Sequence, residues 1–343
     1  MAGDRIALAG MNSALAQLRL RATLRLLGVM TSSLAFTIAM MALVAYAGRA
    51  MAADLAPAAP AGASAAYSEA GADTCLACHG NAAVNGIFRT AHARPGDPRG
   101  PFGHGGLQCE ACHGPGGAHV RARGRSMAGL VDFGPKAAAP GVRQNAMCLA
   151  CHVADAAHDW ASGAHAGSGI ACVQCHQMHA AQDPVKSALG QTAVCTACHQ
   201  AQRADLEKPS HHPLREGKMR CTSCHAPHGS SATAQLVKNT VTETCTACHA
   251  ELRGPYLWEH QPVAEDCSTC HDAHGSVQPA LLKTRAPFLC QQCHEGAGHP
   301  SIANTPQGLA SGVPSAFLLG GSCLNCHSQI HGSNHPAGRA LMR

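Results

Sequence analysis

The sequence predicts a mainly irregular fold of short α-helices, with little or no β-sheet, whose interior is not filled by side chains. Aromatic residues make up only 3% of the 343 residues, too few for a conventional core in a chain of this length. All 20 cysteines fall into Cys-x-x-Cys pairs. These pairs recur every 22 to 39 residues, which indicates an array of similar units that cannot bury a core singly.

A histidine directly follows every Cys-x-x-Cys pair, so the chain contains ten Cys-x-x-Cys-His motifs. Two thiols three positions apart can both add to the vinyl groups of one haem, and the next histidine can then reach the iron. Zinc ribbons, thioredoxin-like sites and disulfides also use paired cysteines, but none of them requires that histidine. We therefore expect ten c-type haems, with iron, as the cofactors.

The covalent attachment sites follow directly from the motifs. The predicted haem-bearing cysteines are Cys75, Cys78, Cys109, Cys112, Cys148, Cys151, Cys172, Cys175, Cys195, Cys198, Cys221, Cys224, Cys245, Cys248, Cys267, Cys270, Cys290, Cys293, Cys323 and Cys326. The predicted proximal iron ligands are His79, His113, His152, His176, His199, His225, His249, His271, His294 and His327. The expected architecture is an elongated multihaem cytochrome c with the haem stack as its core. Each motif is expected to open a short helix.

The other fourteen histidines outnumber the ten irons, and they recur with the motifs taken two at a time. Each pair of motifs has histidine between its members and histidine soon after the second. The predicted distal ligands are His92, His119, His165, His179, His212, His228, His260, His274, His299 and His331. The remaining four are favoured as spares: His104, His158, His211 and His335. Among the last two candidates, a His-Gly-Ser triplet shared with His228 and His274 favours His331 over His335.

The expected ligand assignment follows from reach. A histidine only three residues past the proximal one is poorly placed to reach the opposite face of its own haem. It is expected to cap the preceding haem of its pair, and the inner histidine is expected to cap the second haem. Met127, Met147, Met178 and Met219 could ligate iron, but the surplus of histidine disfavours them.

Two histidine ligands close both axial positions of a haem, which favours electron transfer over catalysis and predicts an electron carrier with no catalytic residues. The segment that contains Arg121, Arg123 and Arg125 has two interpretations. Its arginines either contact haem propionates or a partner protein, or they lie on a solvated loop. Trp160 and Trp258 are expected to pack against porphyrins.

The first 52 residues have the features of a signal peptide: a basic start, an apolar run and the small-x-small sequence Ala50-Met51-Ala52. An uncleaved anchor is the alternative, because residues 28–47 could span a bilayer. A flexible linker is expected over 53–72 and the decahaem domain over 73–343, in approximately two pentahaem halves, 73–205 and 206–343. The formal charge of +5 falls to about +1 without the first 52 residues, and no basic tract indicates nucleic-acid binding.

Several stretches resemble the MtrA/DmsE/PioA-type decahaem c-type cytochromes, an outer-membrane electron conduit family. These are Cys-Glu-Ala-Cys-His-Gly-Pro-Gly-Gly from Cys109, the segment 119–127, Leu-Trp-Glu-His at 257–260, the segment 282–287, and the segment 322–336. The likeness covers roughly residues 73–343.

The resemblance implies a wire of bis-histidine haems that lies inside an outer-membrane β-barrel, porin-like partner and is located in the periplasm. It also implies an extracellular multihaem cytochrome or terminal reductase on one side and periplasmic or inner-membrane electron carriers on the other. Metal oxides, ferrous iron and dimethyl sulfoxide respiration are all compatible with such a wire. The alternatives are a multihaem reductase of nitrogen or sulfur oxyanions and a soluble periplasmic electron store.

Overall fold

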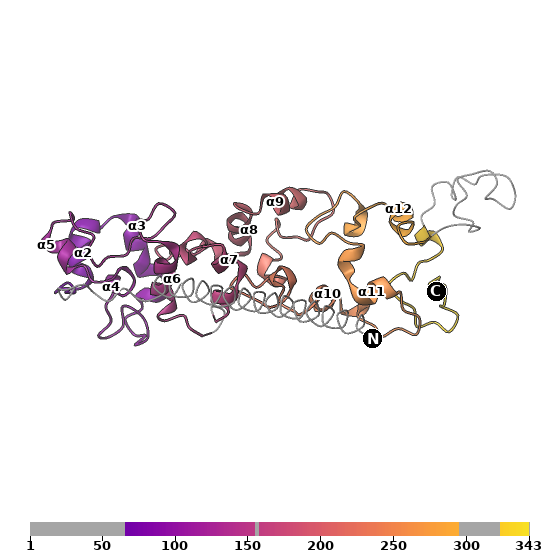
Figure 1. Ribbon diagram of the computed structural model, residues 1–343, viewed down its shortest axis with the longest axis horizontal. Helices are drawn as coiled ribbons and strands as arrows, with labels where there is room; N and C mark the ends of the chain where they lie inside the picture. Colours follow the sequence, from indigo (N-terminus) through magenta and orange to yellow (C-terminus); the bar gives the residue numbers. More distant parts are fainter. Residues whose placement is uncertain (1–65, 155–157, 295–322, 343) are drawn as a thin grey trace, which may run out of the picture. The chain divides into compact units, whose positions relative to one another are not determined.

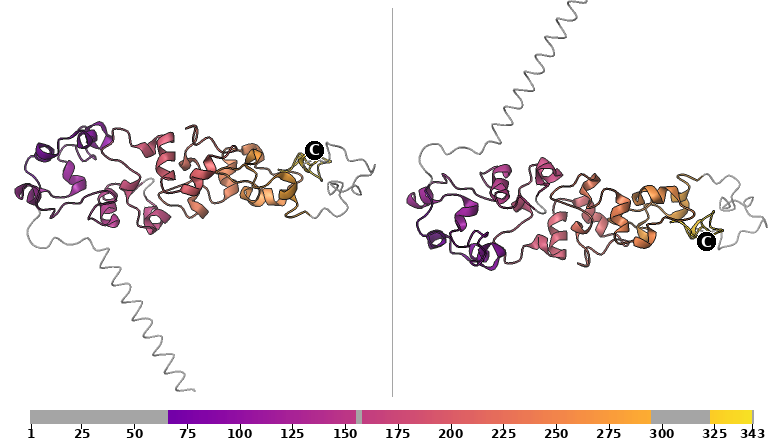
Figure 2. Two further views of the ribbon diagram at one scale, coloured as in Figure 1. Left: turned by 90° about the horizontal axis from the view of Figure 1, so that it is seen from above. Right: turned by 90° about the horizontal axis from the view of Figure 1, so that it is seen from below.

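The structure is a computed structural model that describes residues 66–154, 158–294 and 323–342, all of them within the unit Ala65–Arg343. Figures 1 and 2 show short helices joined by long irregular segments. The α-helices are α2 (Ala72–His79), α3 (Ala82–Asn85), α4 (Cys109–His113), α5 (Gly117–Arg121), α6 (Gly141–Leu149), α7 (Ala164–Gly167), α8 (Ala188–Thr196), α9 (Gln200–Leu206), α10 (Val241–Thr246), α11 (Gln261–Glu265) and α12 (Ala286–Cys290).

Short 3-10 helices lie between the α-helices. They are η1 (Gly86–Arg89), η2 (Ala91–Ala93), η4 (Trp160–Ser162), η5 (Cys172–Gln174), η6 (Pro184–Lys186), η7 (Cys221–Ser223), η8 (Thr233–Gln235), η9 (Ala250–Leu252), η10 (Cys267–Thr269), η11 (Pro279–Leu281) and η14 (Cys323–Asn325). Over the described ranges there is no β-strand, only isolated bridges such as Ser210 with Ser276 and Trp258 with Ser333. The predicted fold class is therefore confirmed.

Each motif forms one helical turn. The histidine amide donates to the carbonyl of the first cysteine, as in His176 to Cys172 (2.9 Å) and His249 to Cys245 (2.9 Å). Residues three and four apart share one face of a helical turn, so both thiols and the imidazole project to the same side. This is the arrangement that one haem requires of its attachment site.

The motifs occupy two different positions in their helices, which corrects the expectation that each opens one. The odd-numbered motifs come at the end of an α-helix, in α2, α6, α8, α10 and α12. Two of these helices begin at a side-chain cap, where Ser187 accepts from the Gly190 amide and Thr240 from the Glu243 amide. The second motif forms α4, and the later even-numbered motifs open η5, η7, η10 and η14.

The side-chain core is thin. The buried hydrophobic residues of the described chain are mostly alanines, joined by Val131, Trp160 and Leu206. None of the described large side chains is completely buried. Apolar residues of this kind supply too little buried surface to order a chain of this length on their own, which agrees with a core built on cofactors.

Candidate haem-binding sites

Consecutive motifs meet through their cysteines in an alternating way. Within each pair of motifs the first thiols interact: Cys75 with Cys109, Cys148 with Cys172, Cys195 with Cys221, Cys245 with Cys267, and Cys290 with Cys323. A hydrogen bond from this contact raises the pKa of Cys148 and lowers that of Cys172 to about 7. These contacts place the two haem attachment sites of a pair side by side.

Between consecutive pairs of motifs, the second cysteines lie close together instead. Cys112 interacts with Cys151, Cys175 with Cys198, Cys224 with Cys248, and Cys270 with Cys293. Burial is the main cause of the raised pKa of Cys112, Cys175, Cys224 and Cys270, and the neighbouring thiol adds to it. Each motif thus contacts the next one along the chain, so the attachment sites follow one another in sequence order without a break.

Among the described residues, nine pairs of histidine rings face one another, with ring centres 5.9 to 6.4 Å apart. Every pair joins a motif histidine to one of the predicted distal histidines. The pairs are His79 with His119, His113 with His179, His152 with His92, His176 with His228, His199 with His165, His225 with His274, His249 with His212, His271 with His331, and His294 with His260. His299 lies outside the described residues.

The separation of the rings fits a haem iron. An imidazole nitrogen binds a transition metal at about 2.0–2.1 Å, so two imidazoles on opposite sides of one iron place their ring centres roughly 6 Å apart. The ring planes make angles from 11° to 86°, which coordination along a common axis permits. The residues present therefore suit bis-histidine haems attached to the adjacent cysteines.

The ring pairs differ from the expected assignment, which only His119 with His79 follows. His92 lies between the first and second motifs, yet it faces His152 of the third. His179 follows the fourth motif, yet it faces His113 of the second. The other pairs repeat this rule: an inner histidine faces the next pair of motifs, and a histidine after a pair faces the previous one.

The physical reason for this rule is that loops of consecutive motif pairs interlock. His165 Nδ1 donates to the Pro227 carbonyl (2.9 Å), and His212 Nδ1 donates to the Ala273 carbonyl (2.8 Å). Trp258 exchanges backbone hydrogen bonds with Ser333 (both 2.9 Å). In each case the inner loop of one pair holds the loop that follows the next pair, and both histidines are carried away from their own motifs.

The His-Gly-Ser triplets have a structural explanation in this interlock. A Cβ atom at Gly229 would overlap the carbonyl of Asp159, one at Gly275 the carbonyl of Asp205, and one at Gly332 the ring of Tyr256. Gly229 and Gly332 also have φ values of 131° and 133°, which L-residues rarely adopt. Glycine after the distal histidine is therefore what lets the two loops approach.

Several ring orientations are fixed by hydrogen bonds from Nδ1. The His113, His225, His271 and His327 rings donate to the carbonyls of Val131, Ala234, Ala280 and Ala340, at 2.6 to 3.0 Å. In the fourth motif, His176 Nδ1 donates to Asp183 Oδ2 at 2.7 Å. A proton on Nδ1 leaves the lone pair of Nε2 for the metal, which is the usual arrangement of a metal-binding histidine.

The environment of five distal rings favours their neutral form. Burial lowers the pKa of His92, His179, His260, His274 and His331, and the facing histidine lowers it further. A neutral imidazole is the form that binds a metal. His274 also lies close to carboxylate oxygens of Asp205 and Asp272, within 4.8 Å, and Asp205 is paired with Lys208 at 2.6 Å.

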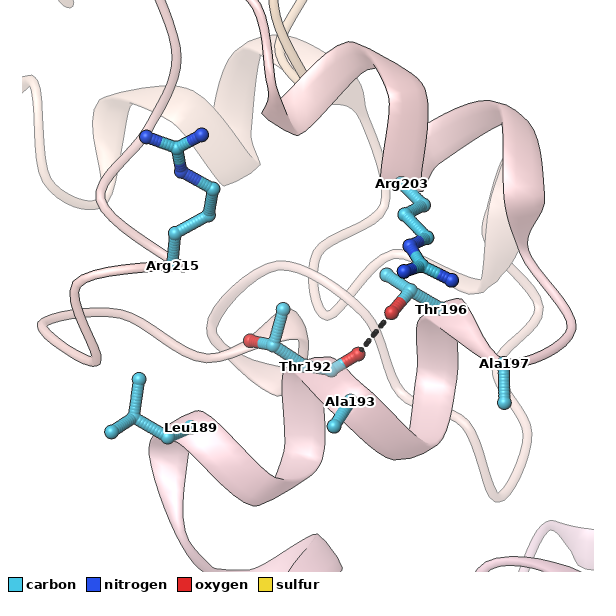
Figure 3. A pocket seen from close by; sticks show the side chains of 7 residues that line it. All are labelled: Leu189, Thr192, Ala193, Thr196, Ala197, Arg203 and Arg215. Carbon is cyan, nitrogen blue, oxygen red and sulfur yellow. Dashed lines mark hydrogen bonds between the residues drawn. The ribbon is translucent and has the colours of Figure 1, made fainter.

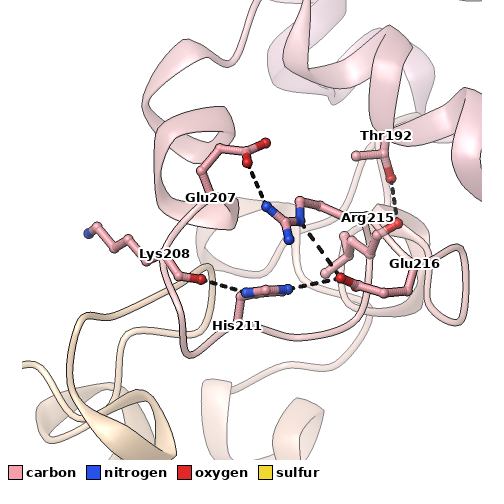
Figure 4. A network of polar contacts seen from close by, with 7 residues as sticks. Thr192, Glu207, Lys208, His211, Arg215 and Glu216 are labelled. Atoms are coloured by element: carbon pink, nitrogen blue, oxygen red, sulfur yellow. Dashed lines mark hydrogen bonds and ion pairs between the residues drawn. The ribbon is translucent and has the colours of Figure 1, made fainter.

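The four histidines favoured as spares face no motif histidine in the described ranges. His211 uses both nitrogens, donating from Nδ1 to the Lys208 carbonyl (2.6 Å) and pairing through Nε2 with Glu216 (3.2 Å), and these contacts raise its pKa (Figure 4). The Nδ1 of His335 accepts from the Ala337 amide, so the neutral ring carries its proton on Nε2. His104 and His158 are exposed.

Residues that sequence reasoning missed lie around the second motif. Glu110 is 5% exposed, and its carboxylate accepts from the Ser68 amide (3.0 Å), the Ser68 hydroxyl (2.8 Å) and the Gly116 amide (2.6 Å). The Ala72 amide donates to the side-chain oxygen of Gln108. The end of the expected linker is therefore attached to the second motif. The sequence shows a glutamate between the two cysteines, but it does not show that Ser68, earlier in the chain, is its partner.

Two cavities lie beside the motifs. One, of about 400 Å³, is lined by Asp159, Thr222 and residues 225–229. The other, of about 380 Å³, lies between Arg203, Arg215 and the outer side of α8 (Figure 3). No histidine lines this second cavity. Arg121, Arg123 and Arg125 are exposed, and Trp160 lies against the His228 ring, with centres 6.2 Å apart.

The fold and the sites together define a multihaem c-type cytochrome. Residues 109–190 match the family described as cytochrome c-type protein NrfB-like, and residues 211–254 and 260–299 match the doubled CXXCH motif family. The chain is 46% identical over 282 residues to the multiheme cytochrome MtrA of Shewanella baltica (strain OS185), covering 81% of this chain and 83% of the relative. The chain therefore belongs to the MtrA family of multihaem electron-transfer cytochromes.

Proposed function

We propose that the chain carries ten bis-histidine haems and conducts electrons through an outer-membrane β-barrel partner, between periplasmic carriers and an extracellular multihaem cytochrome or terminal reductase. The observation that carries the proposal is the succession of motifs that lie close to one another, with a predicted distal histidine facing nine of the described motif histidines. When bound, each haem supplies an iron that cycles between the ferric and ferrous states. The chain supplies the cysteines that attach each haem, the histidines that close both axial positions, and the order in which the haems follow one another.

His299 is the proposed distal ligand of the haem on Cys323 and Cys326. It is the predicted distal histidine that lies between the ninth and tenth motifs, and it lies outside the described residues. The assignment also makes both ends of the array alike. At the first pair His119 turns back to its own pair, and at the last pair His299 would do the same.

An electron-transfer role without catalysis follows from closed haems. An iron with two histidine ligands has no free position for a substrate, so electrons enter and leave through the porphyrin edges. Among the described residues no helix is long and apolar enough to span a membrane. The family resemblance supports a barrel partner for the crossing.

The test is a spectroscopic and a biochemical measurement on the exported protein in its native membrane. Electron paramagnetic resonance of the purified protein should give low-spin ferric signals only, and a haem assay should give ten haems per chain. Mild detergent extraction of outer membranes should co-purify a large β-barrel protein. A high-spin haem would favour the oxyanion reductase, and a wholly soluble periplasmic pool without a barrel would favour an electron store.

A further inference from the structure

In the even-numbered motifs Nδ1 of the proximal histidine donates a hydrogen bond, and the fourth motif differs from the others in its acceptor. In the sixth, eighth and tenth motifs the proximal ring donates from Nδ1 to a main-chain carbonyl, of Ala234, Ala280 and Ala340. The second motif uses the carbonyl of Val131. In the fourth motif the acceptor is a carboxylate, Asp183 Oδ2, at 2.7 Å from His176 Nδ1.

The replacement follows from loop length. The carbonyl acceptors in the sixth and eighth motifs come nine residues after the histidine, on alanines with a φ of 53°. Asp183 comes only seven residues after His176, directly before Pro184 of η6. The main chain of this shorter loop does not reach the His176 ring, but the Asp183 side chain does.

The Asp183 carboxyl group lies in a sheltered place. Its side chain is 8% exposed, and its other oxygen accepts from the Gln177 amide at 3.2 Å. Neither donor is a lysine or an arginine. By contrast, Asp205 near His274 is paired with Lys208, and Glu251 near His249 is exposed, with its oxygen 3.7 Å from Nδ1, beyond hydrogen-bond range.

A carboxylate acceptor changes the metal as well as the ring. Hydrogen bonding of Nδ1 to a carboxylate raises the basicity of the ligating nitrogen, and hydrogen bonds and net charge around a metal centre set its potential. A more basic ligand and a nearby negative charge both stabilise the ferric ion, which carries one more positive charge than the ferrous ion.

We propose that Asp183 tunes the haem on Cys172 and Cys175 to a lower reduction potential than a carbonyl acceptor would give it. That haem then accepts an electron less readily than its even-numbered counterparts and forms an energy step within the array. The proposal rests on the assignment of His176 as an iron ligand, and Asp183 acts through that ligand as a positioning residue.

The test compares the full holoprotein with an Asp183→Asn variant, which keeps the size and an acceptor oxygen but removes the charge. The readout is a spectroelectrochemical titration of the haem absorbance. One tenth of the absorbance change should move to a higher midpoint potential, and the remainder should overlay the unaltered protein. One low-spin signal in electron paramagnetic resonance should shift with it.

Asp266→Asn is the matched control. Asp266 lies directly before Cys267 of the eighth motif and caps the Ser268 amide at 2.7 Å, so it is also close to an attachment site. Its carboxylate bonds no histidine among the described contacts, so the titration should shift less than in Asp183→Asn. A titration of Asp183→Asn that overlays the unaltered protein would overturn the proposal, as would an equal shift in Asp266→Asn.

If the Asp183→Asn variant loses one of its ten haems, Asp183→Ser provides a second variant without the charge. Loss of one haem in both variants would also overturn the proposal, because the carboxylate would then be needed for attachment and not for potential. The haem count and spin state of the unaltered protein test the proposed function separately. Failure to co-purify with a barrel leaves the comparison of potentials intact.

Discussion

His92 and His152 lie with ring centres 6.0 Å apart, although His92 comes before the second motif and His152 completes the third. His165 and His199 repeat the relationship one pair further along, at 6.2 Å. Each of these contacts joins one pair of motifs to the next. The units of the repeat are therefore not independent modules, since the proposed ligands of one unit belong to its neighbours.

The ring pairs predict which haem opens when a distal histidine is removed. His165→Ala should leave the haem on Cys195 and Cys198 five-coordinate, because His165 faces His199. A high-spin signal from one haem in electron paramagnetic resonance should report it. His158→Ala is the control and should remain low-spin, since His158 is exposed and faces no motif histidine.

The site of that signal can be located with a second change. Removing Cys195 and Cys198 together with His165 should abolish the high-spin signal, because the affected haem is then absent. Removing Cys172 and Cys175 with His165 should retain it. The opposite result would contradict the ring pairs and restore the assignment within the motif pair.

Gly275→Ala should displace a distal ligand through the backbone. A Cβ atom at Gly275 would overlap the Asp205 carbonyl, so the loop that carries His274 must withdraw. We expect partial high-spin character for the haem on Cys221 and Cys224, whose motif histidine faces His274. Gly96→Ala is the matched control, because a Cβ atom at Gly96 meets nothing within 4 Å. Equal spectra for both variants would show that the interlock tolerates the extra atom.

Glu110→Gln should loosen the start of the described chain. The amide keeps one acceptor oxygen but turns a donor toward groups that themselves donate, the Ser68 and Gly116 amides. Losing such buried hydrogen bonds costs about 1–3 kcal/mol, which should appear as faster hydrogen exchange of the Ser68 and Ala72 amides. Glu243→Gln, at an exposed position of α10, should leave that exchange unchanged. Unchanged exchange in Glu110→Gln would mean that other contacts hold this segment.

The loop after the second motif should respond to acid through Asp132. Hydrogen bonds from the Ala138 and Ala139 amides lower the pKa of its carboxyl group. A lowered pKa in the folded state means that the stabilisation is present above the unfolded value, about 3.9, and is lost as the pH falls through the folded value. Exchange protection of both amides should therefore drop at acidic pH. In Asp132→Asn it should be independent of pH; a drop of the same size there would point to another group.

The chemistry of this chain was readable from sequence because each haem motif is local. Five consecutive residues hold both thiols and a ligand, so the attachment sites needed no knowledge of the fold. The distal histidines named from their recurrence include every ring that the structure sets opposite a motif histidine, and their binding to iron stays a prediction.

The partner of each distal ring was not readable. It depends on contacts such as His165 with Pro227, between loops about sixty residues apart in the chain. No local pattern reports which loop packs on which, and the shortest path to a neighbouring haem suggested a different neighbour from the one that each ring faces. Asp183 was missed for the same reason, because an aspartate before a proline is common in loops and its contact with His176 is set by the fold.

The interlock of the loops also sets how such a chain can lengthen. An inserted stretch that holds two motifs with both of their histidines would give one ring to each neighbour and receive one from each, so every iron would still find its partner. A single added motif would shift the motifs relative to their distal histidines, so the proposed ligand pairs beyond that point would no longer match. Growth by duplication that keeps every proposed ligand would therefore proceed in steps of two haems, and the span that such a chain reaches would change in the same increments.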